Sequence, residues 1–390
     1  MTFKEKLLQA VQKPKFILVL WILLAVFAGV KQYAKGSYNN YLIFKNVFYH
    51  TLHQENLYLE YPELYGDVNH YGPVFSIVIA PFAMLPDVVG IVLWLMANAL
   101  FLFYAIKTLP IKEEQKILIY WLITNELFTA FVNLQSNPMI TAIIILTYCS
   151  IREEKELWAA LLITFGTFIK LYPIAGLAFF FFSKHKAKFI AYCALWSLLF
   201  FVLPMIISNP EFIVQSYLDW LNELTLKDVK NAALFSYQDF SVMGIYRRAT
   251  GDPTVSSLYF LVPGIVLFFI PYLNISYYKN EIFQQLLLCS VLIFIVIFSS
   301  SSEGSTYIIA FTGVALWFAL HERPYSKTIK ALMIFAFIFT SLSPTIFPSV
   351  LYKELVLKYS LKALPCVLIW GYLIYEMITF KRISQFKHQN

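Results

Sequence analysis

A group of acidic residues in the segment 33–71 has the chemistry of a general base. The segment contains Glu55, Glu60, Glu63 and Asp67. A correctly placed carboxylate takes the proton of a hydroxyl group as that hydroxyl attacks its target. Asp67 is our favoured candidate, because it lies four residues before Tyr71 and Gly72, where the chain turns apolar. The same acids are also typical of a solvated loop.

Three cations have positions suited to holding a phosphate. Lys170 lies in the apolar stretch 166–173, and a cation inside a membrane segment indicates a functional site by default. Snorkelling of its ammonium group to the membrane surface is the alternative. Arg247 and Arg248 lie in the segment 208–256, and guanidinium groups suit bidentate phosphate contacts. A surface pair near anionic headgroups explains these two arginines equally well.

Polar and aromatic residues at the ends of apolar stretches predict a site for a sugar. Gln135 and Asn137 offer amide groups to sugar hydroxyls, although Asn137 before a proline is also a good helix start. Tyr71 can stack on a sugar ring or belong to an interfacial aromatic belt. Asp239, in the segment 208–256, is a further candidate for this site. Glu303 lies among small polar residues, in either a pocket wall or a polar turn.

The composition predicts an all-α, polytopic integral membrane protein. Hydrophobic residues make up 59% of the chain and charged residues 14%, whereas soluble domains carry about 25% charged residues. A helix crosses a bilayer with roughly 20 apolar residues, and on that basis we expect about 11–13 transmembrane helices. No repeat or linker divides the chain, so residues 1–390 are expected to form a single membrane domain.

The basic residues predict the orientation of the chain. They fall in short clusters between apolar stretches, which is the positive-inside pattern of a membrane protein and not a nucleic-acid-binding face. The clusters are Lys4/Lys6/Lys13/Lys15, Lys107/Lys112/Lys116, Arg152/Lys155, Lys184/Lys186/Lys188, Arg323/Lys327/Lys330 and Lys381/Arg382/Lys387. With all of them cytoplasmic, both termini are cytoplasmic, and 33–71 and 208–256 are the two large extracytoplasmic loops.

One part of the chain conflicts with this orientation. Residues 72–107 must then cross the membrane an odd number of times, yet they contain two apolar stretches, 72–86 and 88–107. Either 72–86 is a half-helix that does not cross, or one basic cluster faces outward.

The sequence predicts neither a cofactor nor a metal. It has no glycine-rich phosphate loop and no His-Glu-x-x-His motif, and its four cysteines stand in apolar stretches without metal-ligand spacing. An activated donor is therefore expected to be membrane-borne.

Several short pieces resemble glycosyltransferase family 87, the polyprenol-phosphate-dependent, mannosyltransferase-like proteins of the GT-C class. The pieces are 40–44 (Asn-Tyr-Leu-Ile-Phe), 56–58 (Asn-Leu-Tyr), 71–75 (Tyr-Gly-Pro-Val-Phe), 80–86 (Ala-Pro-Phe-Ala-Met-Leu-Pro), 134–137 (Leu-Gln-Ser-Asn) and 168–173 (Phe-Ile-Lys-Leu-Tyr-Pro). The resemblance implies a plasma-membrane enzyme with an extracytoplasmic active site. Such an enzyme moves a sugar, often mannose, from a polyprenyl phosphate to a cell-envelope glycan or glycolipid, with inversion.

The chain departs from the family pattern at three places. The position of the family's early acid resembles Asn40, which cannot take a proton; either Asp67 replaces that acid or the transferase activity is lost. The usual Tyr-Pro-Pro is Tyr71-Gly72-Pro73, and the later histidine-containing piece is replaced by 302–307, where Glu303 is expected to contribute. Asn40 is then expected to line the sugar or acceptor site.

Two other functions are also consistent with the sequence. A transporter or flippase of a lipid-linked sugar would also explain an intramembrane Lys170, although no inverted repeat is detectable and a transporter does not need a long acidic loop. A non-catalytic relative that binds the lipid-linked sugar would explain Asn40.

Overall fold

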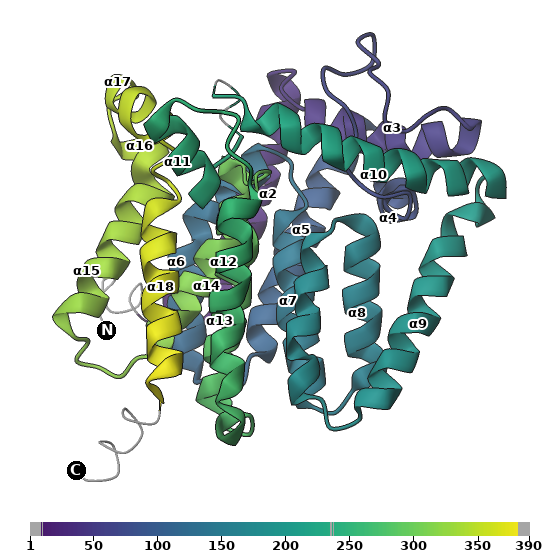
Figure 1. Ribbon diagram of the computed structural model, residues 1–390. Helices are drawn as coiled ribbons and strands as arrows, with labels where there is room; N and C mark the ends of the chain where they lie inside the picture. Colours follow the sequence, from purple (N-terminus) through teal and green to yellow (C-terminus); the bar gives the residue numbers. More distant parts are fainter. Residues whose placement is uncertain (1–8, 10, 235, 237, 381–390) are drawn as a thin grey trace. The chain divides into compact units, whose positions relative to one another are not determined.

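Two compact helical units make up the chain in the computed structural model, which describes residues 9, 11–234, 236 and 238–380. These described residues form no strand (Figure 1). The first unit comprises Met1–Tyr120 and Leu127–Lys227, and the second comprises Trp121–Glu126 and Asp228–Asn390. The predicted all-α class is therefore confirmed, and a single membrane domain covering both units stays a prediction. Of the basic residues used for the orientation, Lys4, Lys6, Lys381, Arg382 and Lys387 lie outside the described residues.

The first unit is built mainly from helices that follow the apolar stretches. They are α2 (Pro14–Ala34), α3 (Asn39–His53), α4 (Phe75–Ala83), α5 (Asp87–Thr108), α6 (Glu113–Val132, partly in the second unit), α7 (Asn137–Arg152), α8 (Glu156–Ile169), the 3-10 helix η1 (Tyr172–Phe182), α9 (Lys186–Val202), η2 (Leu203–Ile206) and α10 (Pro210–Ala232). Proline stands in the first turn of α2, α7 and η1, where its fixed φ suits the helix and its missing N–H removes no bond. Almost every residue of α7 is buried, which makes α7 the central helix of this unit.

The length of the short helix α4 bears on the conflict over residues 72–107. It has 9 residues, about 14 Å at 1.5 Å per residue, whereas the hydrocarbon core is about 30 Å thick. The next helix, α5, has 22 residues and is apolar enough to cross. One helix of this segment is therefore long enough to cross, which favours the half-helix alternative and agrees with the positive-inside arrangement.

Helices α3 and α10 run in a different direction from α7 and α8 of the same unit. In Figure 1, α3 and α10 lie across the ends of α7, α8 and α9 instead of alongside them. Up to Lys227, α10 packs on the first loop through an apolar cluster of Leu57, Tyr58, Ile213, Tyr217 and Trp220. The segments expected as loops, 33–71 and 208–256, thus contain helices. Helices α3 and α10 were not predicted, because both mix polar and apolar residues.

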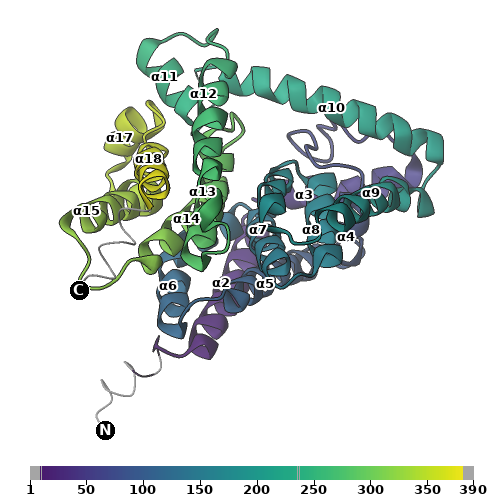
Figure 2. The same cartoon turned by 60° about the horizontal axis from the view of Figure 1, so that its bottom comes forward.

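The second unit is a bundle around α13 and α14. Its elements are α11 (Val242–Thr250), α12 (Leu258–Phe269), η3 (Ile270–Leu273), η4 (Ile275–Tyr277), α13 (Glu281–Ile297), η5 (Gly304–Thr306), α14 (Tyr307–Leu320), α15 (Lys327–Ala336), η6 (Phe337–Leu342), α16 (Ser343–Ile346), α17 (Ser349–Leu351), η7 (Tyr352–Leu357) and α18 (Leu364–Ile378). Gly313 lets α13 and α14 approach closely, because a Cβ there would lie 2.9 Å from the Cys289 carbonyl. Helix α18 packs beside this pair (Figure 2).

Candidate active site

Tyr71 joins the end of the first loop to the turn between α6 and α7. Its hydroxyl lies 2.8 Å from Ser136 Oγ and donates a hydrogen bond of 3.2 Å to Gln135 Oε1. Its carbonyl accepts hydrogen bonds from the Asn69 amide group (2.9 Å) and the Tyr58 hydroxyl (3.0 Å). Because both ends of the tyrosine are bonded, its ring has a defined place in the protein.

Lys170 completes this cluster from the end of α8. Its backbone is extended (φ −153°, ψ 135°), so the helix stops and the side chain turns toward α7. Nζ donates a 2.9 Å hydrogen bond to Asn137 Oδ1. It also lies 5.5 Å from the ring centre of Tyr71 and 5.1 Å from that of Tyr172, within the range of a cation–π interaction. An ammonium group is thus held beside aromatic rings and amide groups.

The turn that carries Gln135 and Asn137 has a local cause. Leu134 adopts a left-handed conformation (φ 55°), which reverses the chain after α6, and its carbonyl accepts a hydrogen bond of 3.2 Å from Trp94 Nε1. Pro138 then stands in the first turn of α7, which begins at Asn137. Asn40 reaches the same turn from α3, because its amide group donates a 2.8 Å hydrogen bond to the Asn133 carbonyl.

Gly72 sets the distance between Tyr71 and α8. Its N–H donates a 3.0 Å hydrogen bond to the Ile169 carbonyl. A Cβ at this position would lie 2.2 Å from the Phe168 carbonyl oxygen and 2.9 Å from the Trp220 ring. Only glycine fits in this space without a shift of the backbone, so the glycine of Tyr71-Gly72-Pro73 is a packing requirement of this fold.

Asp67 lies on the exposed surface of the same loop, three residues before His70. Its Oδ1 accepts a 2.8 Å hydrogen bond from the Val68 N–H. The carboxylate is therefore accessible to an acceptor molecule from solvent, and its role as base stays a prediction.

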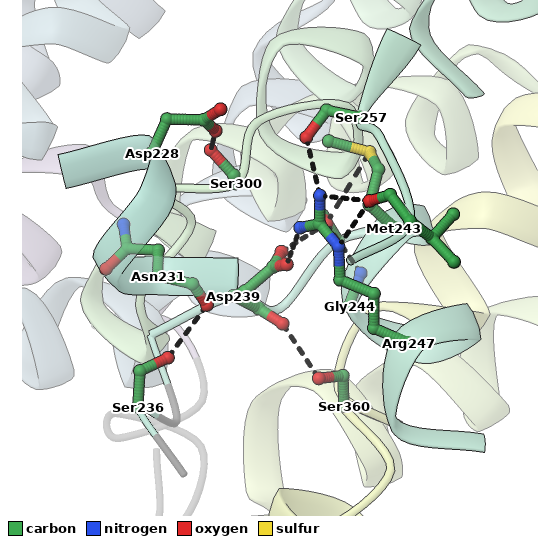
Figure 3. A network of polar contacts seen from close by, with 12 residues as sticks. Asp228, Asn231, Ser236, Asp239, Met243, Gly244, Arg247, Ser257, Ser300 and Ser360 are labelled. Atoms are coloured by element: carbon green, nitrogen blue, oxygen red, sulfur yellow. Dashed lines mark hydrogen bonds and ion pairs between the residues drawn. The ribbon is translucent and has the colours of Figure 1, made fainter. Parts of the chain in front are cut away.

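In the second unit, Asp239 and Arg247 form a buried ion pair (Figure 3). Arg247 Nη1 lies 3.1 Å from Asp239 Oδ2, and the other guanidinium nitrogens donate to the Val255 carbonyl and to Ser257 Oγ. The Ser241 hydroxyl donates to Asp239 Oδ1. Burial raises the pKa of the Asp239 carboxyl to about 6, although the bonds from Ser241 and the charge of Arg247 oppose this shift.

Arg248 extends this network on its other side. Its Nη1 donates to the Leu357 carbonyl (2.9 Å) and to Ser360 Oγ (2.6 Å). Ser360 Oγ in turn donates a 2.8 Å hydrogen bond to the Asp239 carbonyl. The structure therefore brings Asp239, Arg247 and Arg248 together in one buried network, and their predicted roles toward phosphate and acceptor stay predictions.

Glu303 lies in the turn between α13 and α14. The Ser302 hydroxyl of this turn donates to the Phe240 carbonyl (2.8 Å), and Lys362 Nζ donates to the Gly304 carbonyl (3.0 Å). Lys362 is itself paired with Glu126 at 3.2 Å, and both side chains are buried. The turn that carries Glu303 is thus held in place from two directions.

The model of glycosyltransferase family 87 matches residues 69–300, which is more than half of the chain. The chain belongs to glycosyltransferase family 87. No curated protein and no solved structure matches it. Because family 87 is a GT-C membrane family, the match confirms the predicted class of fold. The matched region contains Tyr71, Gln135, Asn137 and Lys170 and leaves out Asp67.

For this family 87 protein, the structure joins four residues that were singled out separately in the sequence. Tyr71, Gln135, Asn137 and Lys170 come from three different segments and are linked by hydrogen bonds or cation–π contacts. Among the described residues, four apolar helices are long enough to cross a membrane and further apolar helices are shorter, as expected for a multi-pass protein. No three His, Cys, Asp or Glu side chains of the described residues are arranged to hold a metal ion.

Two pairs of ionisable side chains were not predicted from the sequence. His70 and Glu223 lie 3.3 Å apart in the first unit, and Glu126 and Lys362 pair in the second. The rule that singled out Lys170, a charge inside an apolar stretch, applies equally to Glu126 and would have found it. Nothing local in the sequence connects His70 with Glu223.

Replacing Gly72 by alanine tests the close packing behind Tyr71. We expect the Gly72→Ala variant to lose about 1–3 kcal/mol of stability, the usual cost of overpacking, because the backbone must move away from Phe168. Thermal unfolding in detergent measures this loss. Gly371→Ala is the control, since a Cβ there has no neighbour within 4 Å. Equal unfolding temperatures for the two variants would contradict the packing argument.

Proposed function

We propose that this family 87 protein moves a hexose, mannose or a similar sugar, from a polyprenyl-phosphate donor to a cell-envelope glycan or glycolipid. Transfer takes place on the extracytoplasmic face of the plasma membrane and inverts the anomeric centre. Membership of the family supports glycosyl transfer as the class of reaction. The observation that supports a phosphate-linked donor is the Lys170 ammonium group, held among Tyr71, Tyr172 and Asn137.

Each group has a distinct task in this proposal. The acceptor hydroxyl attacks the anomeric carbon while the bond from that carbon to the phosphate oxygen breaks, and the polyprenyl phosphate leaves with the bonding electrons. Asp67 takes the hydroxyl proton. Lys170 stabilises the negative charge that develops on the departing phosphate. The amide groups of Gln135 and Asn137, with the Tyr71 hydroxyl, bind the sugar hydroxyls.

The remaining predicted residues have secondary roles. We prefer Lys170 to Arg247 and Arg248 as the residue that binds the donor phosphate. The two arginines already form hydrogen bonds within the protein, to Asp239, Val255, Leu357 and Ser360. Arg247 and Arg248 stay candidates for a second phosphate contact. Asn40 and Asp239 stay candidates for the acceptor side, and Glu303 for a second acid–base group.

Release of free polyprenyl phosphate is the measurement that tests the function. Purified protein in sealed vesicles receives polyprenyl-phosphate-mannose and a cell-envelope extract. We expect time-dependent release of polyprenyl phosphate that requires both the protein and the extract. Movement of the labelled donor between the two leaflets without release would contradict the proposal and support a flippase.

Replacing Lys170 by methionine tests its contact with the phosphate. A hydrogen bond to a charged group contributes about 1.5–3 kcal/mol, so we expect Lys170→Met to weaken donor binding about 10- to 100-fold. Equilibrium binding of a fluorescent donor analogue measures this change. Lys31→Met is the matched control, because Lys31 also lies over an aromatic ring, Phe27 at 5.5 Å. If both variants bind the donor like the wild type, Lys170 only snorkels.

A further inference from the structure

Two carboxylates of α10 contact side chains of the first loop, one helical turn apart. Asn56 Nδ2 donates a 2.9 Å hydrogen bond to Asp219 Oδ2. Four residues further along α10, Glu223 Oε1 lies 3.3 Å from His70 Nδ1. Residues four apart stand on the same face of a helix, so both carboxylates face the loop.

The His70–Glu223 contact is enclosed, which distinguishes it from the Asn56–Asp219 contact. The Glu223 side chain is 7% exposed and the His70 side chain is 20% exposed. Both Nδ1 and Oε1 are shielded from solvent, and neither has a hydrogen-bond partner from elsewhere among the described residues. A buried carboxylate oxygen with no other partner is costly, so its position opposite the imidazole nitrogen requires a specific reason.

The chain around His70 connects this pair with the proposed transfer site. His70 stands between Asp67 and Tyr71 in the sequence, and its carbonyl accepts a 3.0 Å hydrogen bond from Trp220 Nε1. The Trp220 ring in turn packs against Gly72. Helix α10 therefore contacts the segment 67–72 at three points: the His70 side chain, the His70 carbonyl and Gly72.

We propose that Glu223 is a positioning residue for sugar transfer: by holding the His70 ring, it fixes the segment that carries Asp67 and Tyr71. This inference rests on the proposed function of these two residues. A substitution far from the reacting atoms that shifts a catalytic group by about 1 Å can lower the rate about 10²-fold. A residue that touches no substrate can therefore still control turnover.

The charges around His70 give this pair its own pH dependence. Burial lowers the pKa of His70 below its ordinary value of 6.5; Lys227 lowers it further, whereas Glu223 and Asp67 raise it. The ring is therefore neutral near pH 7, with Nδ1–H available as a donor to Glu223. The pKa of His70 is lower in the folded protein than in the unfolded chain. The folded arrangement of this pair is therefore fully stable above pH 6.5 and loses stability as the pH falls below that value.

Removal of single charges on α10 tests the proposal. We expect Glu223→Gln to lower kcat about 10- to 100-fold, with the KM for the donor within about twofold of the wild type because Lys170 still binds the phosphate. Asp219→Asn, which removes a charge from the same face of the same helix, should stay within about twofold in kcat. Equal losses in the two variants, or full activity of Glu223→Gln, would overturn the proposal.

A double-variant comparison shows whether Glu223 acts through His70. His70→Gln should lower kcat by a similar factor, and the double variant Glu223→Gln/His70→Gln should be no slower than either single variant. Losses that multiply would show independent roles. In Glu223→Gln the acid limb of the pH–rate profile should move to lower pH, because the charge that raises the His70 pKa is gone. An unchanged acid limb would contradict the link to His70.

Amide exchange of the free protein separates this proposal from the proposed function, because it needs no sugar donor. The Tyr71 N–H donates to Asn69 Oδ1 and the Gly72 N–H to the Ile169 carbonyl. We expect faster exchange of these two amides in Glu223→Gln and unchanged exchange in Asp219→Asn. If the amides exchange in this way but the wild-type protein shows no transferase activity, the proposed function is rejected and the positioning of the loop by Glu223 is retained. Unchanged exchange in both variants would reject the contact itself.

Discussion

Asp67→Asn should lower the rate of sugar transfer about 10²- to 10⁴-fold, the usual contribution of a general base. The amide keeps the size of the side chain and cannot take the proton of the acceptor hydroxyl. Because Asp67 is exposed on the first loop, the substitution should leave folding and donor binding unchanged. Release of polyprenyl phosphate measures the rate, and binding of a donor analogue measures the affinity.

The control for this variant is another exposed acid of the same loop. Glu63→Gln removes one negative charge close to Asp67 in the chain, so it reproduces any general electrostatic effect. We expect normal transfer from Glu63→Gln. Normal transfer from Asp67→Asn would contradict its role as the base, and Glu303→Gln would then be the next variant to measure.

Arg247→Met should destabilise the protein by about 3–5 kcal/mol, the range found when one partner of a buried ion pair is removed. The substitution leaves the buried Asp239 carboxylate without its guanidinium partner, and the Val255 carbonyl loses two hydrogen bonds. The expected result is a large fall in the unfolding temperature.

Two comparisons show whether the buried pair causes this loss. Arg247→Met/Asp239→Asn should be less destabilised than the single variants predict in sum, because the unpaired charge is gone. Lys358→Met, which breaks the exposed Lys358–Glu354 pair, should not change the unfolding temperature measurably. Wild-type stability of Arg247→Met together with weaker donor binding would reject the structural role and favour the phosphate role predicted from the sequence.

The pH dependence of this variant follows from Asp239. Its pKa in the folded protein is about 6, above the ordinary 3.8. A raised carboxyl pKa means that the folded protein favours the protonated form, so stability falls as the pH rises from about 3.8 through 6. Removal of Arg247 raises this pKa further. The destabilisation of Arg247→Met should therefore be smaller at pH 5 than at pH 8, measured by thermal unfolding.

Much of the candidate site could be predicted, because its polar and charged residues stand at the ends of apolar stretches or in the turns between them. Gln135 and Asn137 lie in one short turn, and Lys170 and Tyr71 each end or begin an apolar stretch. Apolar stretches of membrane length alternate in direction, so the ends that share one face can be assigned from the basic clusters. The prediction that these four residues lie at the same face therefore required only the order of the helices, and the structure brings their side chains together.

Local chemistry also predicted the all-helical class, because a chain with so few charges satisfies its backbone in a membrane by helix formation. The helices α3 and α10 were missed, since helices that mix polar and apolar residues need not contain a long apolar stretch. The sequence left two alternatives for the segment 72–86, and the observed length of α4 favours the half-helix.

Tertiary structure alone decided which charged groups are paired. His70 meets Glu223, and Lys362 meets Glu126, although the partners lie far apart in the chain. Arg247 was predicted to hold a phosphate because an arginine in an outer loop has the right chemistry. In the folded chain its guanidinium also pairs with Asp239, which nothing in the sequence indicated. A side chain's type determines which partners it can bind. The partner that it does bind depends on burial, which excludes water and leaves the opposite charges and polar groups nearby to compensate a buried charge.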